Sequence, residues 1–434
     1  MGAGVSGRDP GAAGHAAAVV GRARPGPVHA VALALVLAAG ACAPRPAPLA
    51  APGAHWLGTW AASPQLTEPR NMPPAPGLAG NTLRQLIHVS VGGPRIRVRL
   101  SNAFGDGPLT VAAARIARPA ADSVRARSES AIDTAGARAL SFGGADSVTI
   151  AAGATATSDP LDYQVAPLSD LALTLRFGAV PAGLTGHPGS RTTSYIAPGD
   201  RVAAPDLAGA ATTEHWYVVA GLDVAAEGAA VVTLGNSITD GRGSGTNLND
   251  RWPDDLARRL AADPRTRGVA VLNAGIGGNK ILAGGLGPTA PSRLERDVLE
   301  ASGARWVVVL EGVNDLGGAE PGTAAAVARD LIAAYRRIIE RAHARGLKVY
   351  GGTITPFAGS FYDRPEREEA RQTVNRWIRT GGAYDAVIDF DAAVRDPADP
   401  SRLLPAADTG DHLHPNEAGY RMMADAVDLA LFTP

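Results

Sequence analysis

The segment that decides the fold of the C-terminal half reads AVVTLGNSITD and spans residues 230–240. Its first part, Ala230 to Leu234, is a short apolar run that indicates a buried strand. A tight turn and a helix start follow, which would place Ser237 at the edge of a sheet. A serine hydroxyl is a weak nucleophile until a base takes its proton. Taken alone, Ser237 fits better the role of a residue that satisfies backbone N–H groups at a helix start.

Downstream of this segment, apolar strands alternate with amphipathic helices. We expect further strands at residues 269–272, 306–310, 347–351 and 386–390, and helices at 252–262, 294–301, 324–345, 367–380 and 418–431. Continuous apolar strands separated by helices favour an α/β fold, with a parallel sheet covered by flanking helices. We assign this α/β domain to residues 225–434.

Upstream, residues 55–224 show a different pattern, in which short strands alternate apolar and polar residues. Examples are Ile96 to Leu100 and Leu171 to Leu175, with glycine-rich turns between such runs. This pattern predicts a smaller all-β, sandwich-like domain. The aromatic side chains of this region could line a sugar-binding face, but packing in the core or at a domain interface is the better interpretation. They are Trp56, Trp60, His88, Trp216 and Tyr217.

Three more polar segments lie near the ends of predicted strands or before the last helix. The glycine-rich segment 273–279 could direct a backbone N–H group into a cavity, and residues 311–315 include Asn314, whose amide could donate to an oxyanion. In the third, Asp411 precedes His414 by three residues and could hold its imidazole in one tautomer. A metal site built from Asp411, His412 and His414 is the weaker alternative.

Together, these four segments, in this order, resemble the signature blocks of the SGNH (GDSL-like) hydrolases. The resemblance implies a Ser237, His414 and Asp411 triad, and an oxyanion hole formed by Ser237, Gly278 and Asn314. It implies no metal and no cofactor. One departure is that Asn236 stands where the family has aspartate, which is not the triad acid. The region before is similar to the β-domain of some bacterial esterases of this family, including ones linked to xylan deacetylation.

The implied function is that of a serine esterase acting through an acyl-enzyme. Acetyl esters of polysaccharides and short-chain acyl or lipid esters would both suit the triad. The alternative is a surface glycan-binding lipoprotein with a decayed hydrolase domain, but all four blocks are present. With a formal net charge of −1, the chain gives no electrostatic case for nucleic acid as a partner.

The first residues have the layout of an export signal. Arg22 and Arg24 precede the apolar run 30–39, which is too short to span a bilayer permanently and ends close to Cys42. Cys42 is the single cysteine of the 434-residue chain, and its position resembles a lipoprotein lipobox. We expect a signal peptide at 1–42, lipid attachment at Cys42 as the only membrane contact, an Ala/Pro-rich tether at 43–54, and export to the cell envelope. A cleaved signal of a secreted protein is the alternative.

Overall fold

The computed structural model describes residues 55–120 and 130–433, which all fall in one compact unit. The predicted signal peptide, Cys42 and the tether at 43–54 lie outside the described residues. Among the helices of the described part, none has the length and apolar character needed to cross a membrane.

The C-terminal region contains a five-stranded sheet in which all neighbouring strands are parallel. In spatial order the strands are β17 (Val269–Gly275), β16 (Ala229–Gly235), β18 (Ala304–Leu310), β19 (Lys348–Gly352) and β20 (Ala386–Ile388). Every residue of β16 is buried, as expected for a central strand with both faces covered. This sheet and its helices confirm the predicted α/β fold class.

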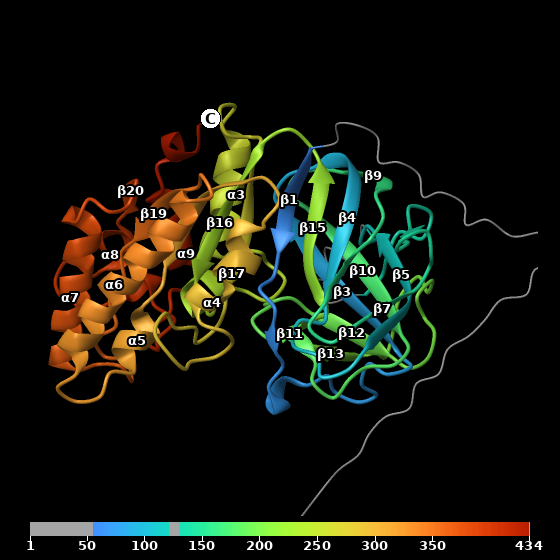
Figure 1. Cartoon of the computed structure of the whole chain (residues 1–434), viewed down its shortest axis with the longest axis horizontal. Coiled ribbons are helices and arrows are strands. Elements are labelled where there is room, and N and C mark those ends of the chain that lie inside the picture. Colours follow the sequence, from blue (N-terminus) through green and yellow to red (C-terminus); the bar gives the residue numbers. More distant parts are fainter. Residues whose placement is uncertain (1–54, 121–129, 434) are drawn as a thin grey trace, which may run out of the picture. The chain divides into compact units, whose positions relative to one another are not determined.

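Two groups of helices flank this sheet, and the helices within each group contact one another (Figure 1). The first group consists of α3 (Trp252–Ala262), α8 (Phe390–Val394) and α9 (Glu417–Asp425). The second group consists of α4 (Ala290–Leu294), α5 (Val313–Gly317), α6 (Ala324–His343) and α7 (Pro365–Thr380). The four-residue helix α2 (Ser237–Asp240) follows β16 directly.

The strand order places three of the candidate segments together. Strand β16 has β17 on one side and β18 on the other, so the order of the strands reverses at β16. In open parallel sheets, ligands bind beyond the carboxyl ends of the strands at such a reversal. Gly235 at the end of β16 pairs with Gly275 on β17 and Leu310 on β18. The segments that follow these three strands therefore start from the same edge of the sheet.

Three predicted elements differ from the structure. Instead of one helix at 294–301, α4 ends at Leu294 and a π-helical turn covers Glu295–Leu299. The strand predicted at 386–390 stops at Ile388, because the side chain of Asp389 caps α8 by accepting from the N–H group of Ala392. The helix predicted at 418–431 ends at Asp425, and Asp428 caps a separate 3-10 turn at Leu429–Phe432.

The N-terminal region contains antiparallel sheets, as the alternating sequence pattern predicts. The first consists of β1 (Trp56–Ala61), β15 (Val219–Ala225), β4 (Gly93–Ser101) and β8 (Thr155–Thr157), with β9 (Leu161–Val165) also paired to β4. The second consists of β13 (Ala211–Thr213), β12 (Ser194–Ala197), β3 (Thr82–Val89), β10 (Ser169–Phe177), β5 (Leu109–Ala117) and β6 (Arg138–Ala139), with β7 (Val148–Ile150) paired to β5. A third, small sheet contains β14 (Trp216–Tyr217), β11 (Thr185–His187) and β2 (Gln65–Leu66).

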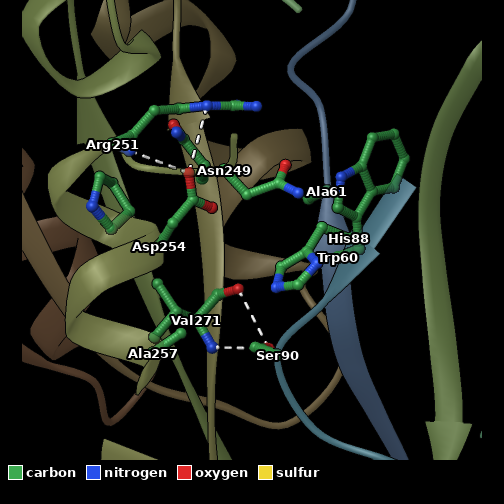
Figure 2. Close-up of a pocket in the computed structure, with 11 residues that line it drawn as sticks. Trp60, Ala61, His88, Ser90, Asn249, Arg251, Asp254, Ala257 and Val271 are labelled. Atoms are coloured by element: carbon green, nitrogen blue, oxygen red, sulfur yellow. Dashed lines mark hydrogen bonds and ion pairs between the residues drawn. The ribbon is translucent and has the colours of Figure 1, made fainter. Parts of the chain in front are cut away.

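The two regions are joined by direct contacts as well as by the chain. Ser90 accepts a hydrogen bond at its Oγ from the backbone N–H of Val271, at 3.0 Å, which satisfies a donor on the edge strand β17. Figure 2 shows this contact beside a small cavity of about 20 Å³, where Trp60 and His88 face residues of the C-terminal region. Trp60, Trp216 and Tyr217 are buried, which confirms the interpretation that they pack in the interior.

Candidate active site

The first segment brings Ser237 to the start of helix α2. The Oδ1 atom of Asn236 accepts a hydrogen bond from the backbone N–H of Ile238, at 3.0 Å, and thereby caps this short helix. Its amide donates weakly to the backbone carbonyl of Leu310 and to Glu311, at 3.3 and 3.5 Å. The asparagine therefore supplies a donor beside the carboxyl of Glu311, whose pKa burial raises to about 8.

The structure brings Ser237, His414 and Asp411 into one hydrogen-bonded chain. Ser237 Oγ lies 2.9 Å from His414 Nε2, and His414 Nδ1 lies 2.7 Å from Asp411 Oδ2. Asp411 also accepts from the backbone N–H groups of Leu413 and His414, at 3.0 and 2.8 Å. Because an ionised carboxylate can only accept, Nδ1 carries the proton and Nε2 is free to accept one from the serine.

The electrostatics of this chain keep the histidine neutral and the aspartate charged. Burial lowers the pKa of His414, an effect that Asp411 opposes and the positive charges of Arg242 and Arg191 reinforce. Burial acts to raise the pKa of Asp411, but the hydrogen bonds from His414 outweigh it and lower the pKa to about 2. At neutral pH, His414 is therefore available as a base and Asp411 is ionised.

His412 takes a separate position. Its Nδ1 lies 2.6 Å from Asp408 Oδ2, and its side chain is 47% exposed. The two histidines of this segment thus contact different carboxylates, and only His414 reaches the serine. No group of three potential metal ligands occurs within the described residues.

Hydrogen-bond donors that could stabilise a negatively charged oxygen line a cavity beside Ser237. This cavity has a volume of about 430 Å³, and its lining includes Ser237, Gly278, Asn314 and His414. Gly278 has a φ of +70°, a conformation that favours glycine. Among the described residues, the backbone N–H groups of Ser237 and Gly278 have no hydrogen-bond acceptor. Both donors are therefore free to bind an oxyanion.

The amide of Asn314 is held in one orientation. Its Nδ2 donates to the backbone carbonyl of Asn279 at 2.8 Å, and its Oδ1 accepts from the Tyr362 hydroxyl at 3.0 Å. A carbonyl only accepts, so Nδ2 must face Asn279, and its second hydrogen remains available. Tyr362 was not predicted from the sequence, because it lies far from all four segments and is brought to Asn314 only by the fold.

Two buried charged residues hold the loops that carry these donors. Asp315 accepts from the backbone N–H groups of Ile281 and Leu282, at 3.0 and 2.9 Å, and so fixes the loop after β17. Arg293, which is fully buried, donates to the carbonyls of Gly235 and Ala274 at the ends of β16 and β17, at 3.0 and 2.6 Å. It also donates to the side chain of Asn279. Arg293 was missed because no local pattern distinguishes it from other helix arginines.

Fold and site together define an α/β domain with a hydrogen-bonded Ser-His-Asp chain beside its parallel sheet. Residues 233–422 match the family model described as the GDSL-like Lipase/Acylhydrolase family, and this part of the chain is therefore similar to domains of that family. Three of the four sequence segments, 273–279, 311–315 and 411–414, fall wholly within the match, and so does Ser237 of the first segment.

Solved structures with a similar fold include a GDSL-like lipase from Bacteroides thetaiotaomicron, with 22% identity, a TM-score of 0.33, and coverage of 46% of this chain and 87% of that one. Another is Axe2, an acetylxylan esterase from Geobacillus stearothermophilus, with 23% identity, a TM-score of 0.35, and coverage of 46% and 93% respectively. No curated protein matches the chain.

Proposed function

We propose that this protein is a serine esterase that hydrolyses carboxylic esters through an acyl-enzyme. The observation that carries the proposal is the 2.9 Å contact between Ser237 Oγ and His414 Nε2, with Asp411 on the other ring nitrogen. A hydroxyl paired with a neutral, oriented imidazole is an activated nucleophile. The match of residues 233–422 to a GDSL-like lipase/acylhydrolase family model supports the same reaction class.

In the first half-reaction, Ser237 Oγ attacks the ester carbonyl while His414 Nε2 takes the hydroxyl proton. The carbonyl oxygen becomes negatively charged and is stabilised by the N–H groups of Ser237 and Gly278 and the amide of Asn314. His414 then gives its proton to the departing alcohol, and the bond between the carbonyl carbon and the alcohol oxygen breaks. The acyl group remains on Ser237.

In the second half-reaction, a water molecule takes the place of the alcohol. His414 accepts a proton from the water as it attacks the acyl-enzyme, and the same three donors stabilise the new oxyanion. His414 then returns the proton to Ser237 Oγ, and the carboxylic acid leaves. Asp411 stays ionised throughout and stabilises the imidazolium that forms twice in each cycle. No metal or cofactor takes part in these steps.

Acetylated polysaccharides are one candidate substrate class, and short-chain acyl or lipid esters are the other. The first is favoured by the polar lining of the cavity, which includes Glu68, Arg70, Asn71 and Arg242. Apolar and aromatic side chains, among them Leu286, Phe361 and Leu413, make up the smaller part of the lining. The acetylxylan esterase activity belongs to the structural neighbour by its name, and for this protein it is part of the proposal.

A panel of purified substrates tests the proposed function. It consists of acetylated xylan and aryl esters with acyl chains of graded length. We expect hydrolysis of the short-chain members by the wild-type protein and a loss of about 10⁴ to 10⁶-fold in kcat in Ser237→Ala. Ser292→Ala, which changes an exposed serine on α4, is the matched control and should keep full activity. Equal rates of hydrolysis in Ser237→Ala and wild type would contradict Ser237 as the nucleophile. Absence of hydrolysis by the wild type on every member of the panel would favour the alternative of a non-catalytic glycan-binding protein.

We also propose that the protein is exported and held at the cell envelope by a lipid on Cys42. The support is the apolar run 30–39 directly before this cysteine and the Ala/Pro-rich stretch after it. Diacylation would give stable anchoring that a single chain does not provide. Mass spectrometry of the mature N-terminus checks this, since an unmodified terminus at another residue would contradict the lipid anchor and support a secreted form.

A further inference from the structure

The N-terminal β-region supplies part of the wall of the active-site cavity. Ser237, Asn314 and His414 from the C-terminal region line this cavity together with Arg70 and Arg191 from the N-terminal region. The cavity volume of about 430 Å³ is in the range of small-molecule sites. A substrate positioned for attack by Ser237 would therefore contact side chains of both regions.

Three arginines in this cavity carry unpaired charges. They are Arg70, Arg191 and Arg242. Within residues 55–120 and 130–433, no side chain or backbone oxygen accepts a hydrogen bond from any of their guanidinium groups. The Nε atom of Arg191 is buried and has no partner. A buried donor without an acceptor is costly, so such a group in a cavity points to a ligand that supplies the acceptor.

The carboxylates that line the same cavity are already engaged. Glu68 accepts hydrogen bonds from Gln65 Nε2 at 2.9 Å and from Asn71 Nδ2 at 2.8 Å. Asp240 lies 2.8 Å from Nε2 of the buried His187. The charged groups with hydrogen-bonding capacity left to meet a substrate are therefore the three arginines. With three arginines against two carboxylates, the residues that line the cavity carry an excess of positive charge, although the whole chain has a formal net charge of −1.

The backbone that presents Arg191 is fixed by contacts with the C-terminal region. Gly189 packs so closely against Asp240 that a Cβ atom would lie 1.8 Å from its Oδ2. The carbonyl of Ser190 accepts from Arg251 at 3.0 Å, and the carbonyl of Arg191 accepts from the backbone N–H of Asn247 at 2.9 Å. Arg191 itself has a φ of +50°, which is uncommon for a residue with a side chain. Such a held conformation is typical of functional positions.

We propose that Arg191, together with Arg242 and Arg70, binds an anionic group of the substrate, so that the enzyme prefers esters carrying a carboxylate near the scissile bond. This inference rests on the proposed esterase function and names its substrate class. Guanidinium groups pair with carboxylates through charge-assisted hydrogen bonds. The positive charges of Arg242 and Arg191 add to the lowering of the pKa of His414 by burial, consistent with their position beside the proposed base. Acetylated glycans that contain uronic acids have the required chemistry.

The test compares two aryl acetates of equal size, the anionic 4-acetoxybenzoate and the neutral 4-acetoxybenzamide. The readout is the ratio of their kcat/KM values, and comparing this ratio between variants cancels the difference in leaving-group chemistry. We expect Arg191→Gln to lower the ratio by about 10-fold, and Arg191→Lys to lower it less. The exposed Arg376 on α7 gives the matched control, since Arg376→Gln should leave the ratio unchanged.

Arg242→Gln provides a second variant at an exposed position, in case Arg191→Gln does not fold, and thermal unfolding of each variant checks this. A third probe, 4-acetoxyphenyl phosphate, identifies the anion. If the enzyme prefers the phosphate probe over the benzoate probe and Arg191→Gln removes this preference, the assignment of a carboxylate as the recognised group is wrong. The group recognised would then be a phosphate. A ratio that stays the same in Arg191→Gln and Arg242→Gln, while the wild type hydrolyses both acetates, would overturn this inference alone. Failure of the wild type to hydrolyse any probe would overturn the esterase function as well.

Discussion

The two regions contribute to one cavity in different ways. The C-terminal region provides Ser237, His414 and the oxyanion donors from short segments that each follow a strand or precede a helix. The N-terminal region provides Arg70 and Arg191 from turns that contain no recognisable motif. The difference indicates that the proposed chemistry resides in the C-terminal region, whereas the proposed recognition is shared by Arg70 and Arg191 of the N-terminal region and Arg242 of the C-terminal region. Changes to the triad or the oxyanion donors should lower kcat, changes to these arginines should alter the choice of substrate, and changes at the contact between the regions should alter stability.

The largest effect should come from the two histidines of the last segment. His414→Ala removes the base on Ser237 and should lower kcat by about 10⁴ to 10⁶-fold. His412 contacts only Asp408 and is half exposed, so His412→Ala should change kcat by less than about threefold. Steady-state kinetics on a short-chain aryl ester measures both. A larger loss in His412→Ala than in His414→Ala would contradict the assignment of the base.

Next in size is the effect of the oxyanion donor. Asn314→Ala should lower kcat by about 10² to 10³-fold and change KM less, because the donor acts mainly on the charge that develops in the transition state. Tyr362→Phe keeps the amide but removes the hydroxyl that orients it, so its loss should be smaller. If Asn314→Ala changed KM alone, Asn314 would be a substrate-binding residue instead.

The free energy of unfolding should depend on the buried contact between the two regions. The pair formed by His187 and Asp240 is buried, and removing one partner of a buried pair typically costs about 3 kcal/mol or more. His187→Ala should therefore lower the free energy of unfolding by roughly this amount, as measured by urea denaturation. His343→Ala is the matched control, because its pair with Asp385 is exposed and should contribute less than about 1 kcal/mol. Equal losses in the two variants would mean that the buried contact does not couple the regions.

The sequence predicted the C-terminal region better than the N-terminal one. The helix predicted at 252–262 matches α3, and the strands of the parallel sheet were placed to within a few residues, because continuous apolar runs and helical periodicity are local signals. The helix predicted at 418–431 was too long. Its apolar pattern continues past Asp425, but Arg259 donates to the carbonyl of Val427 at 2.9 Å and Asp428 caps a new turn.

The residues of the candidate site differ in the same way, between those with a local sequence signal and those without one. Ser237, Gly278, Asn314, Asp411 and His414 could be named because each lies in a short segment that resembles a signature block of the SGNH hydrolases. Tyr362 and Arg293 could not, because their roles depend on contacts with residues distant in sequence. Arg191 was also missed, since an arginine in a loop gives no local signal and its importance arises only from the absence of a partner within the described residues.

The smallest expected effect is on the pH profile. Since His414 must be neutral to act as a base, kcat/KM should rise as pH increases through the pKa of His414, which burial places below its usual value. The charges of Arg242 and Arg191 add to this lowering, so Arg191→Gln should move the rising limb to higher pH. A shift to lower pH would show that Arg191 does not act on the base through its charge.

Labelling with a serine-directed fluorophosphonate tests the central claim most directly, because the reagent reacts only with an activated serine. Peptide mass spectrometry should find one adduct, on Ser237, with loss of ester hydrolysis in proportion to labelling. Ser237→Ala should take up no label, and His414→Ala should react far more slowly than wild type. An adduct on another residue, or full hydrolytic activity in protein completely labelled at Ser237, would contradict the account.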